Sequence, residues 1–291
     1  MIVITAPTGQ IGHHVLDNLA GGSDPVRVIV RDPGRLPAAV RDRVEVVRGS
    51  HNDPAVLAKA FDGADAVLWL VPPNPGTDDP MEHYRAFTRP ACEAAEARGV
   101  RRIVGISSLG ADYGKDAGLL TPAFAMDDLF AKTGVAYRSL RMPYFMENFL
   151  TQAESLRNQG MLFLANDADR PLRLVATRDV ASAATRLLLD DGWTGREDVP
   201  VLSPDELTPV QMAQTVSEVL GKPVAFRQVP MADYKATMTG YGMSDAWAQG
   251  LVDMARAQND GIYEAEAAAA TPSPTTFLQW CREVLAPTLQ G

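Results

Sequence analysis

Short apolar runs alternate with longer amphipathic stretches along the first two-thirds of the sequence, and this alternation constrains the fold more than any other feature. Runs that stay apolar at consecutive positions indicate strands buried on both faces, as in parallel sheets covered by helices. The expected strands span 2–5, 26–30, 44–47, 66–71, 103–106, 137–140 and 172–176. Right-handed crossovers between them predict an α/β fold, a doubly wound parallel sheet of the Rossmann type.

A glycine-containing loop directly follows the first expected strand, where residues 6–12 read Ala-Pro-Thr-Gly-Gln-Ile-Gly, and an amphipathic helix comes next. A pyrophosphate at such a turn needs backbone N–H groups of a helix N-terminus and a residue without a side chain at the closest approach. Ala6 replaces the first glycine of the G-x-x-G-x-x-G pattern and adds a methyl group at the turn. An ordinary turn remains the alternative, but strand and helix favour dinucleotide binding through Thr8, Gly9, Gln10, Ile11 and Gly12.

Arginine follows the second expected strand, where an acidic residue would bind the ribose hydroxyls of NAD. Arg31 occupies the strand end and Arg35 lies four residues further on. A guanidinium can donate two hydrogen bonds to a 2′-phosphate, which predicts NADP(H) as the cofactor. In the competing interpretation, Asp32 binds the ribose and both arginines are solvated.

The residue pattern of the sequence changes near residue 190. Proline-rich turns follow, together with helical segments at 209–220 and 244–258. We expect residues 1–150 to form the NADP-binding core. Residues 151–291 are expected to supply the remaining Rossmann elements and a smaller, mostly helical C-terminal region that binds the substrate.

Charge and composition restrict the partners of the chain. The net charge of −9 disfavours binding to nucleic acid and to anionic membranes. No apolar run approaches the roughly 18 residues of a membrane span, and no basic leader precedes the first strand. The two cysteines, Cys92 and Cys281, lack metal-site spacing, so no metal is predicted and a cytoplasmic location is expected.

The loop, Arg31 and the segment 141–149, Arg-Met-Pro-Tyr-Phe-Met-Glu-Asn-Phe, resemble the NmrA-like branch of the atypical short-chain dehydrogenases/reductases. Further matching positions are 49–53, 107–108, 133–135 and 179–181. The resemblance implies NADP(H) along the strand ends and a cleft roofed by the C-terminal region. It also implies one of two kinds of protein: reductases of quinones, dyes, phenylpropanoid ethers or iminium ions, or NADP-binding regulators without catalysis.

Ordinary short-chain dehydrogenases use a Tyr-x-x-x-Lys pair, whose tyrosine delivers a proton to a carbonyl. The sequence contains no such pair, and the corresponding positions hold Ala123 and Asp127. Carbonyl reduction by the usual route is therefore not expected.

The resemblance places other polar and apolar residues near the nicotinamide. Ser108, Tyr144 and Asn148 are the candidate catalytic residues. Strand-end serines are also common in turns, and Tyr144 could belong to the core, so both interpretations stay open. The further candidates for cofactor binding are Val71, Pro72, Ser107, Pro143, Tyr144 and Phe145.

Two functions are compatible with these features. The first is an NADPH-dependent reductase that passes a hydride to a small, hydrophobic, electrophilic acceptor, such as a quinone, an imine or iminium ion, an enone or a dye. The alternative is a non-catalytic NADP(H) redox sensor that regulates a partner protein. We expect a monomer or a homodimer.

Overall fold

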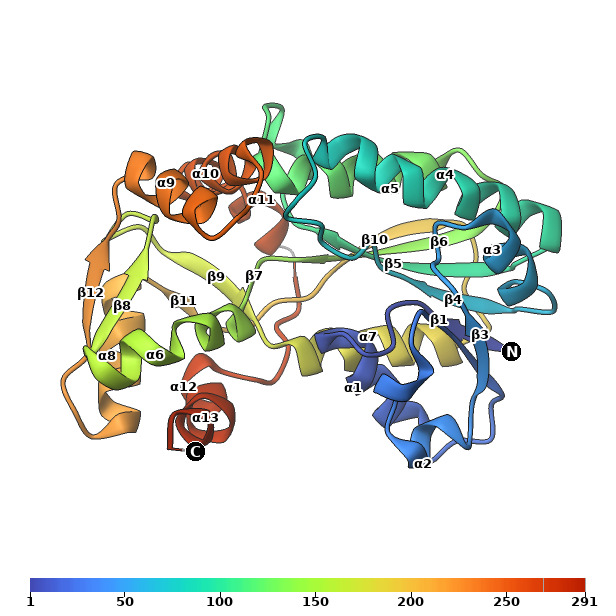
Figure 1. Ribbon diagram of the computed structural model, residues 1–291, viewed down its shortest axis with the longest axis horizontal. Coiled ribbons are helices and arrows are strands. Elements are labelled where there is room, and N and C mark those ends of the chain that lie inside the picture. Colours follow the sequence, from blue (N-terminus) through green and yellow to red (C-terminus); the bar gives the residue numbers. More distant parts are fainter. Residues whose placement is uncertain (269, 291) are drawn as a thin grey trace.

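Seven parallel strands form the central sheet, in the order β10-β6-β5-β4-β1-β2-β3. The computed structural model describes residues 1–268 and 270–290 (Figure 1). The strands are β1 (Ile2–Ile4), β2 (Val26–Val30), β3 (Glu45–Arg48), β4 (Ala66–Trp69), β5 (Arg102–Ser108), β6 (Ala136–Met142) and β10 (Arg196–Pro200). The predicted doubly wound Rossmann fold is confirmed.

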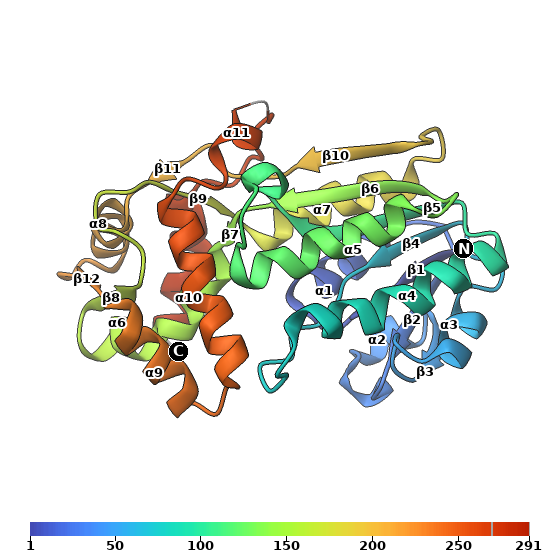
Figure 2. The ribbon, with the colours of Figure 1, turned by 90° about the horizontal axis from the view of Figure 1, so that it is seen from above.

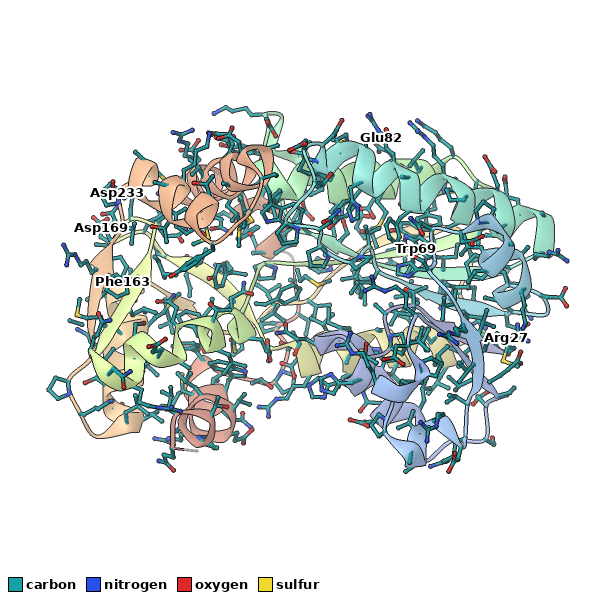
Figure 3. All side chains as sticks on the ribbon, viewed as in Figure 1. Arg27, Trp69, Glu82, Phe163, Asp169 and Asp233 are labelled. Atoms are coloured by element: carbon teal, nitrogen blue, oxygen red, sulfur yellow. The ribbon has the colours of Figure 1, made fainter. Side chains whose placement is uncertain are left out.

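Helices cover both faces of this sheet, as Figure 2 shows. One face packs on α1 (Gln10–Leu19) and α7 (Thr177–Leu189), the other on α3 (Pro54–Ala60), α4 (Pro80–Arg98) and α5 (Thr121–Ala131). Alternate residues of a strand serve different faces: Val104 packs among α1 and α7 side chains, and Ile103 belongs to the opposite core with Trp69 (Figure 3). This two-sided burial explains the continuous apolar runs.

One predicted strand belongs elsewhere. Residues 172–176 were expected in the main sheet, but β9 (Leu172–Val175) pairs with β7 (Tyr144–Phe145) and β11 (Glu206–Leu207) in a separate three-stranded sheet. The seventh main-sheet strand is β10, whose sequence Arg-Glu-Asp-Val-Pro is exposed or half-buried. An edge strand of this kind carries no apolar run, so hydrophobic patterning could not find it.

A second lobe lies beyond the carboxyl ends of the main strands, on the left in Figure 1. The predicted helices appear as α8 (Pro209–Leu220), which Thr208 and Gln211 begin with a capping box, and α10 (Asp245–Asn259), which Ser244 caps. Strands β8 (Met161–Leu164) and β12 (Ala225–Gln228) pair in parallel, and Figure 3 labels Phe163 on β8. The remaining elements are α6 (Ala153–Asn158), α9 (Met231–Gly240), α11 (Glu264–Ala267), α12 (Phe277–Trp280) and α13 (Ala286–Gln290).

The division at residue 150 stays a prediction. The chain leaves the main sheet after β6, but α7 and β10 return to it, so the two lobes are interleaved in sequence. Within the described part of the chain, no helix is both long enough and apolar enough to cross a bilayer.

Glu147 of the segment 141–149 ties the lobes together. Its buried carboxylate accepts hydrogen bonds from the backbone N–H of Thr177 at 3.0 Å and from the indole N–H of Trp280 at 3.1 Å. Thr177 begins α7 beside the main sheet, and Trp280 lies in the second-lobe core with Phe149 and Phe277. Both partners donate an N–H group, so the side chain at position 147 must offer two acceptor oxygens.

Replacing Glu147 with glutamine should lower the free energy of unfolding by about 2 kcal/mol, because the amide offers one acceptor oxygen to two buried donors. Urea unfolding measures the change. The same substitution at exposed Glu154 is the matched control and should leave stability within about 0.5 kcal/mol of the wild type. Equal stability of the two variants would show that Glu147 does not hold the lobes.

Candidate active site

The loop between β1 and α1 is tighter than its sequence indicates. Ala6 has φ of 48°, and among the described residues it is the one non-glycine residue with a positive φ. The Gly9 N–H donates to the Ala6 carbonyl at 3.0 Å and closes the turn. Ala6 therefore does more than add a methyl group at the turn: the position imposes a left-handed backbone, which costs an alanine roughly 1–2 kcal/mol.

Two glycines fit this loop to a pyrophosphate. A Cβ on buried Gly12 would lie 2.2 Å from the Ala6 carbonyl oxygen, so only glycine lets α1 begin so close to the turn. Gly9 is exposed and stands at the N-cap without a side chain to bond the first-turn N–H groups. A helix N-terminus with free N–H groups and no side chain over it is a favourable anion site.

The other loop residues contribute in different ways. Thr8 is half-buried and Gln10 is exposed, so their side chains are accessible beside the loop. Ile11 is buried in the core against β1, which leaves its backbone N–H as the group that could meet a phosphate.

Arg31 and Arg35 are exposed beyond the end of β2, next to the loop strand β1 in the sheet. Asp32 caps the short turn at Pro33–Arg35 and accepts the Gly34 N–H at 3.0 Å. This bond occupies one oxygen of the carboxylate that would have to bind ribose in the competing interpretation. The second carboxylate oxygen has no hydrogen-bond partner among the described residues, so the choice between Asp32 and the arginines stays a prediction.

The candidates from the next strands meet at the same edge of the sheet. Val71 and Pro72 follow β4, and the Pro72 carbonyl is held by His83 at 2.8 Å. Ser107 and Ser108 end β5, where they pair with Arg141 and Met142 of β6. Buried Pro143 and half-buried Tyr144 and Phe145 come immediately after β6. The fold thus gathers these residues at the strand ends, where α/β sheets bind ligands.

Asp127 of α5, the position expected to correspond to the catalytic lysine of ordinary short-chain dehydrogenases, is almost fully buried. Its carboxylate accepts hydrogen bonds from the hydroxyls of Ser107 and Tyr137, each at 2.6 Å, and of Ser139 at 2.9 Å. Burial raises the pKa of Asp127, while these three hydrogen bonds and Arg141 lower it. Ala123 lies one helical turn away and is buried. Ala123 and Asp127 are thus neither a tyrosine nor a lysine, and Asp127 instead joins α5 to β5 and β6 by hydrogen bonds.

Tyr263 of the second lobe is a site candidate that the sequence did not reveal. The Gln258 amide donates to its hydroxyl at 3.0 Å, and Asn166 in turn donates to Gln258. Burial raises the pKa of Tyr263 to about 12, although its interactions with Gln258 and Ser108 lower it. The phenol therefore stays protonated at neutral pH beside Ser108.

Tyr144 and Asn148 are neighbours of this group. Burial raises the pKa of Tyr144, and the charges of the Tyr234 and Tyr263 phenols raise it further, while a hydrogen bond with Asn148 lowers it. The Tyr234 and Tyr263 phenols, from two separate segments, thus both lie within electrostatic reach of Tyr144. No local pattern could have indicated this grouping, because residues 144, 234 and 263 are distant in sequence.

The second lobe also contacts the loop after β4. The Ser244 N–H at the start of α10 donates to the Pro75 carbonyl at 2.9 Å, and its hydroxyl donates to the Thr77 carbonyl. These bonds connect the turn between α9 and α10 to the chain that leaves the main sheet near Val71. They support the expected roof over the strand ends.

Histidines and cysteines were not expected to bind metal, and that stays a prediction. Nearby ligand atoms of His13, His14 and Asp17 on α1 do lie within 4.8 Å of one another, although His13 is exposed and its Nδ1 contacts the Gly9 carbonyl. Cys92 and Cys281 are both free and buried. Burial raises the pKa of Cys92 to about 12, so this thiol is unreactive at neutral pH.

Known proteins resemble the chain over nearly its whole length. A family model described as NAD(P)H-binding matches residues 7–191. A reductase of (4-alkanoyl-5-oxo-2,5-dihydrofuran-3-yl)methyl phosphate from Streptomyces griseus subsp. griseus is 33% identical over 231 residues, or 79% of this chain and 77% of that protein. Quinone oxidoreductase 2 of Escherichia coli is 29% identical over 256 residues, or 87% and 86%.

Solved structures agree with these matches. An NADPH-dependent quinone oxidoreductase from Escherichia coli, complexed with NADPH, has a TM-score of 0.78 and 25% identity, and the match covers 100% of this chain and 99% of that one. An NmrA mutant has a TM-score of 0.72 at 15% identity, covering 97% and 94%, which shows a shared fold.

His51 is a buried, titratable residue in the core beneath the site. It is 7% exposed, its Nε2 lies 2.9 Å from the Leu70 carbonyl, and its ring packs edge-on against Trp69 and Phe87. Burial is the main cause that lowers its pKa from 6.5 to about 4; the hydrogen bond with the Leu70 carbonyl opposes this shift, and the charges of Arg31 and His83 add to it. Between these two values the unfolded chain binds a proton that the folded protein does not.

Stability should therefore fall as pH decreases from 6.5 toward 4, with His51 contributing roughly 2 kcal/mol of the loss. Urea unfolding at pH 7 and at pH 4.5 measures this difference, which should shrink in a His51→Gln variant. The exposed His13→Gln variant is the control and should keep the wild-type difference. A pH dependence that is unchanged in His51→Gln would contradict the assignment.

Proposed function

Since the chain belongs to the NAD(P)H-binding family, we propose that it is an NADPH-dependent reductase of small, hydrophobic, electrophilic acceptors. The acceptor classes are quinones, imines or iminium ions, enones and dyes. The predicted NmrA-like oxidoreductase assignment and the nicotinamide cofactor are confirmed at the level of the family. Relatives named as a quinone oxidoreductase and as a reductase support the proposed chemistry.

One observation carries the choice of acceptor. Asp127 holds three hydroxyls at the position expected for the lysine of ordinary short-chain dehydrogenases, and Ala123 stands at the position expected for their tyrosine. Neither residue can deliver a proton to a weakly electrophilic carbonyl. Acceptors that are already electrophilic need little acid catalysis, so the protein can act by orienting the reactants and excluding water.

The chain's own residues divide the work. The loop at Thr8–Gly12 would hold the pyrophosphate, and when bound the nicotinamide supplies the hydride. Ser107 gives its only hydroxyl hydrogen to Asp127, so toward a ligand it can only accept a hydrogen bond. Val71, Pro72, Pro143 and Phe145 would form the apolar walls.

The polar groups that would orient the acceptor are Ser108, Tyr144 and Asn148, with Tyr263 added from the second lobe. Ser108 is within donating distance of the Leu109 and Met142 carbonyls, at 3.0 and 3.3 Å, so it has lone pairs left to accept. The phenols of Tyr144 and Tyr263 keep their protons at neutral pH and can donate a hydrogen bond to an acceptor oxygen or nitrogen.

The preference for NADPH over NADH rests on Arg31. An Arg31→Ala variant should bind NADPH about 10-fold to 100-fold more weakly, because it loses charge-assisted hydrogen bonds to the 2′-phosphate, and should bind NADH almost unchanged. Titration of protein fluorescence with each cofactor gives both dissociation constants. Arg41→Ala, which removes another exposed arginine of the same region, is the control. Equal loss for NADPH and NADH would contradict the role of Arg31.

The reaction itself is tested by following NADPH oxidation with a panel of quinones, iminium ions, enones and cationic dyes. We expect turnover with at least one class, and loss of that turnover in a Gly9→Asp variant, whose carboxylate would repel the pyrophosphate. Gly22→Asp, in the exposed turn after α1, is the matched control and should stay active. Tight NADPH binding without turnover of any class would instead favour a non-catalytic NADP(H) sensor.

A further inference from the structure

A hollow of about 540 Å³ lies at the amino ends of β5 and β6, the edge of the sheet opposite the dinucleotide loop. This edge is the end marked by the N-terminus in Figure 1. Three connections build it: the segment between α4 and β5, the turn between α5 and β6, and the loop between α7 and β10. Its lining comprises residues 100–102, 133–136, 191 and 193–196.

Arg102 lines this hollow and is the unusual residue in it. The residue is only 5% exposed, yet its buried Nε and Nη1 atoms have no hydrogen-bond partner among the described residues. Taking a guanidinium out of water without a partner is costly, so such a group is expected to be satisfied by a ligand or by solvent.

Arg138 shows what a satisfied guanidinium looks like in the same place. Both arginines lie over the ring of Trp193, Arg138 at 4.5 Å and Arg102 at 5.8 Å from the ring centroid. Arg138 donates to the Thr194 carbonyl and pairs with Glu197 at 3.3 Å. The described part of the chain thus supplies acceptors to one of two neighbouring arginines and leaves two buried nitrogens of the other, which lines the hollow, without one.

The charge of the lining is also unusual for a chain with a net charge of −9. Arg101, Arg102 and Arg196 all contribute, and Asp191 is the one acidic residue among the lining positions. Arg196 donates one hydrogen bond to the Thr133 carbonyl at 2.7 Å. The guanidinium of Arg101 lies 3.7 Å from the carboxylate of Asp65, which is not a lining residue. The excess of positive charge among the lining residues, around a buried guanidinium with two nitrogens unpartnered within residues 1–268 and 270–290, favours an anion.

We propose that this hollow binds the phosphate group of a small molecule, with Arg102 as its principal ligand. A guanidinium fork matches two phosphate oxygens, and the neighbouring arginines neutralise the second charge. The site lies across the full length of the sheet from the nicotinamide edge, so it is separate from the cofactor site and does not depend on the proposed reductase activity.

Calorimetric titration tests the proposal on the full chain at constant ionic strength, in the presence of saturating NADPH so that the dinucleotide loop is occupied. The probes are inorganic phosphate and phenyl phosphate. We expect saturable binding of at least one probe, which Arg102→Met weakens by about tenfold or more because it removes the fork and keeps the side-chain length. Tighter binding of phenyl phosphate would indicate a phosphate ester, and equal or weaker binding would indicate free phosphate.

Two further variants protect the test against a folding defect. Arg98→Met removes a nearby exposed arginine outside the lining and should leave the affinity within about twofold. Asp191→Asn changes an exposed residue and should tighten binding, because it removes the acidic group of the lining. Absence of saturable binding by both probes, or an Arg102→Met protein that binds like the wild type, would overturn the proposal.

Discussion

The buried carboxylate of Asp127 is the interaction on which the candidate site depends. It draws together β5 and β6 through the hydroxyls of Ser107, Tyr137 and Ser139, and it anchors α5 to both strands. A buried carboxylate is stable only when its oxygens are hydrogen-bonded, so these three donors and the acid require one another. The same network fixes the hydroxyl of Ser107.

The segment 141–149 also joins the two lobes. Arg141 pairs with Glu266 at 3.1 Å and with Asp198 at 3.0 Å, and Glu266 also accepts the N–H groups of Gly110 and Ala111. These contacts hold α11 against the ends of β5 and β6. Tyr263 lies three residues before Glu266, so the contacts of Glu266 also position Tyr263 beside Ser108. Lobe packing and site chemistry therefore share one set of charged groups.

The sequence predicted the features that local patterns determine. The glycine loop before the first helix and the helices at 209–220 and 244–258 depend on neighbours within a few residues, and the structure contains each of them. The pairing of Glu147 with Trp280 spans 133 residues, and that of Asn166 with Gln258 spans 92, so neither could be read locally. Strand β10 was missed because an exposed edge needs no apolar run, and the positive φ of Ala6 because only the closed turn imposes it.

The central claim is hydride transfer that needs no proton donor in the rate-limiting step, and isotope effects test it most directly. Oxidation of NADPH deuterated at C4 should be slower than that of ordinary NADPH, with an acceptor that the panel identifies, because the transferred atom is heavier. The rate in D2O should equal the rate in water. A rate that falls in D2O and ignores the deuterated cofactor would contradict the account, since a proton transfer would then limit the reaction.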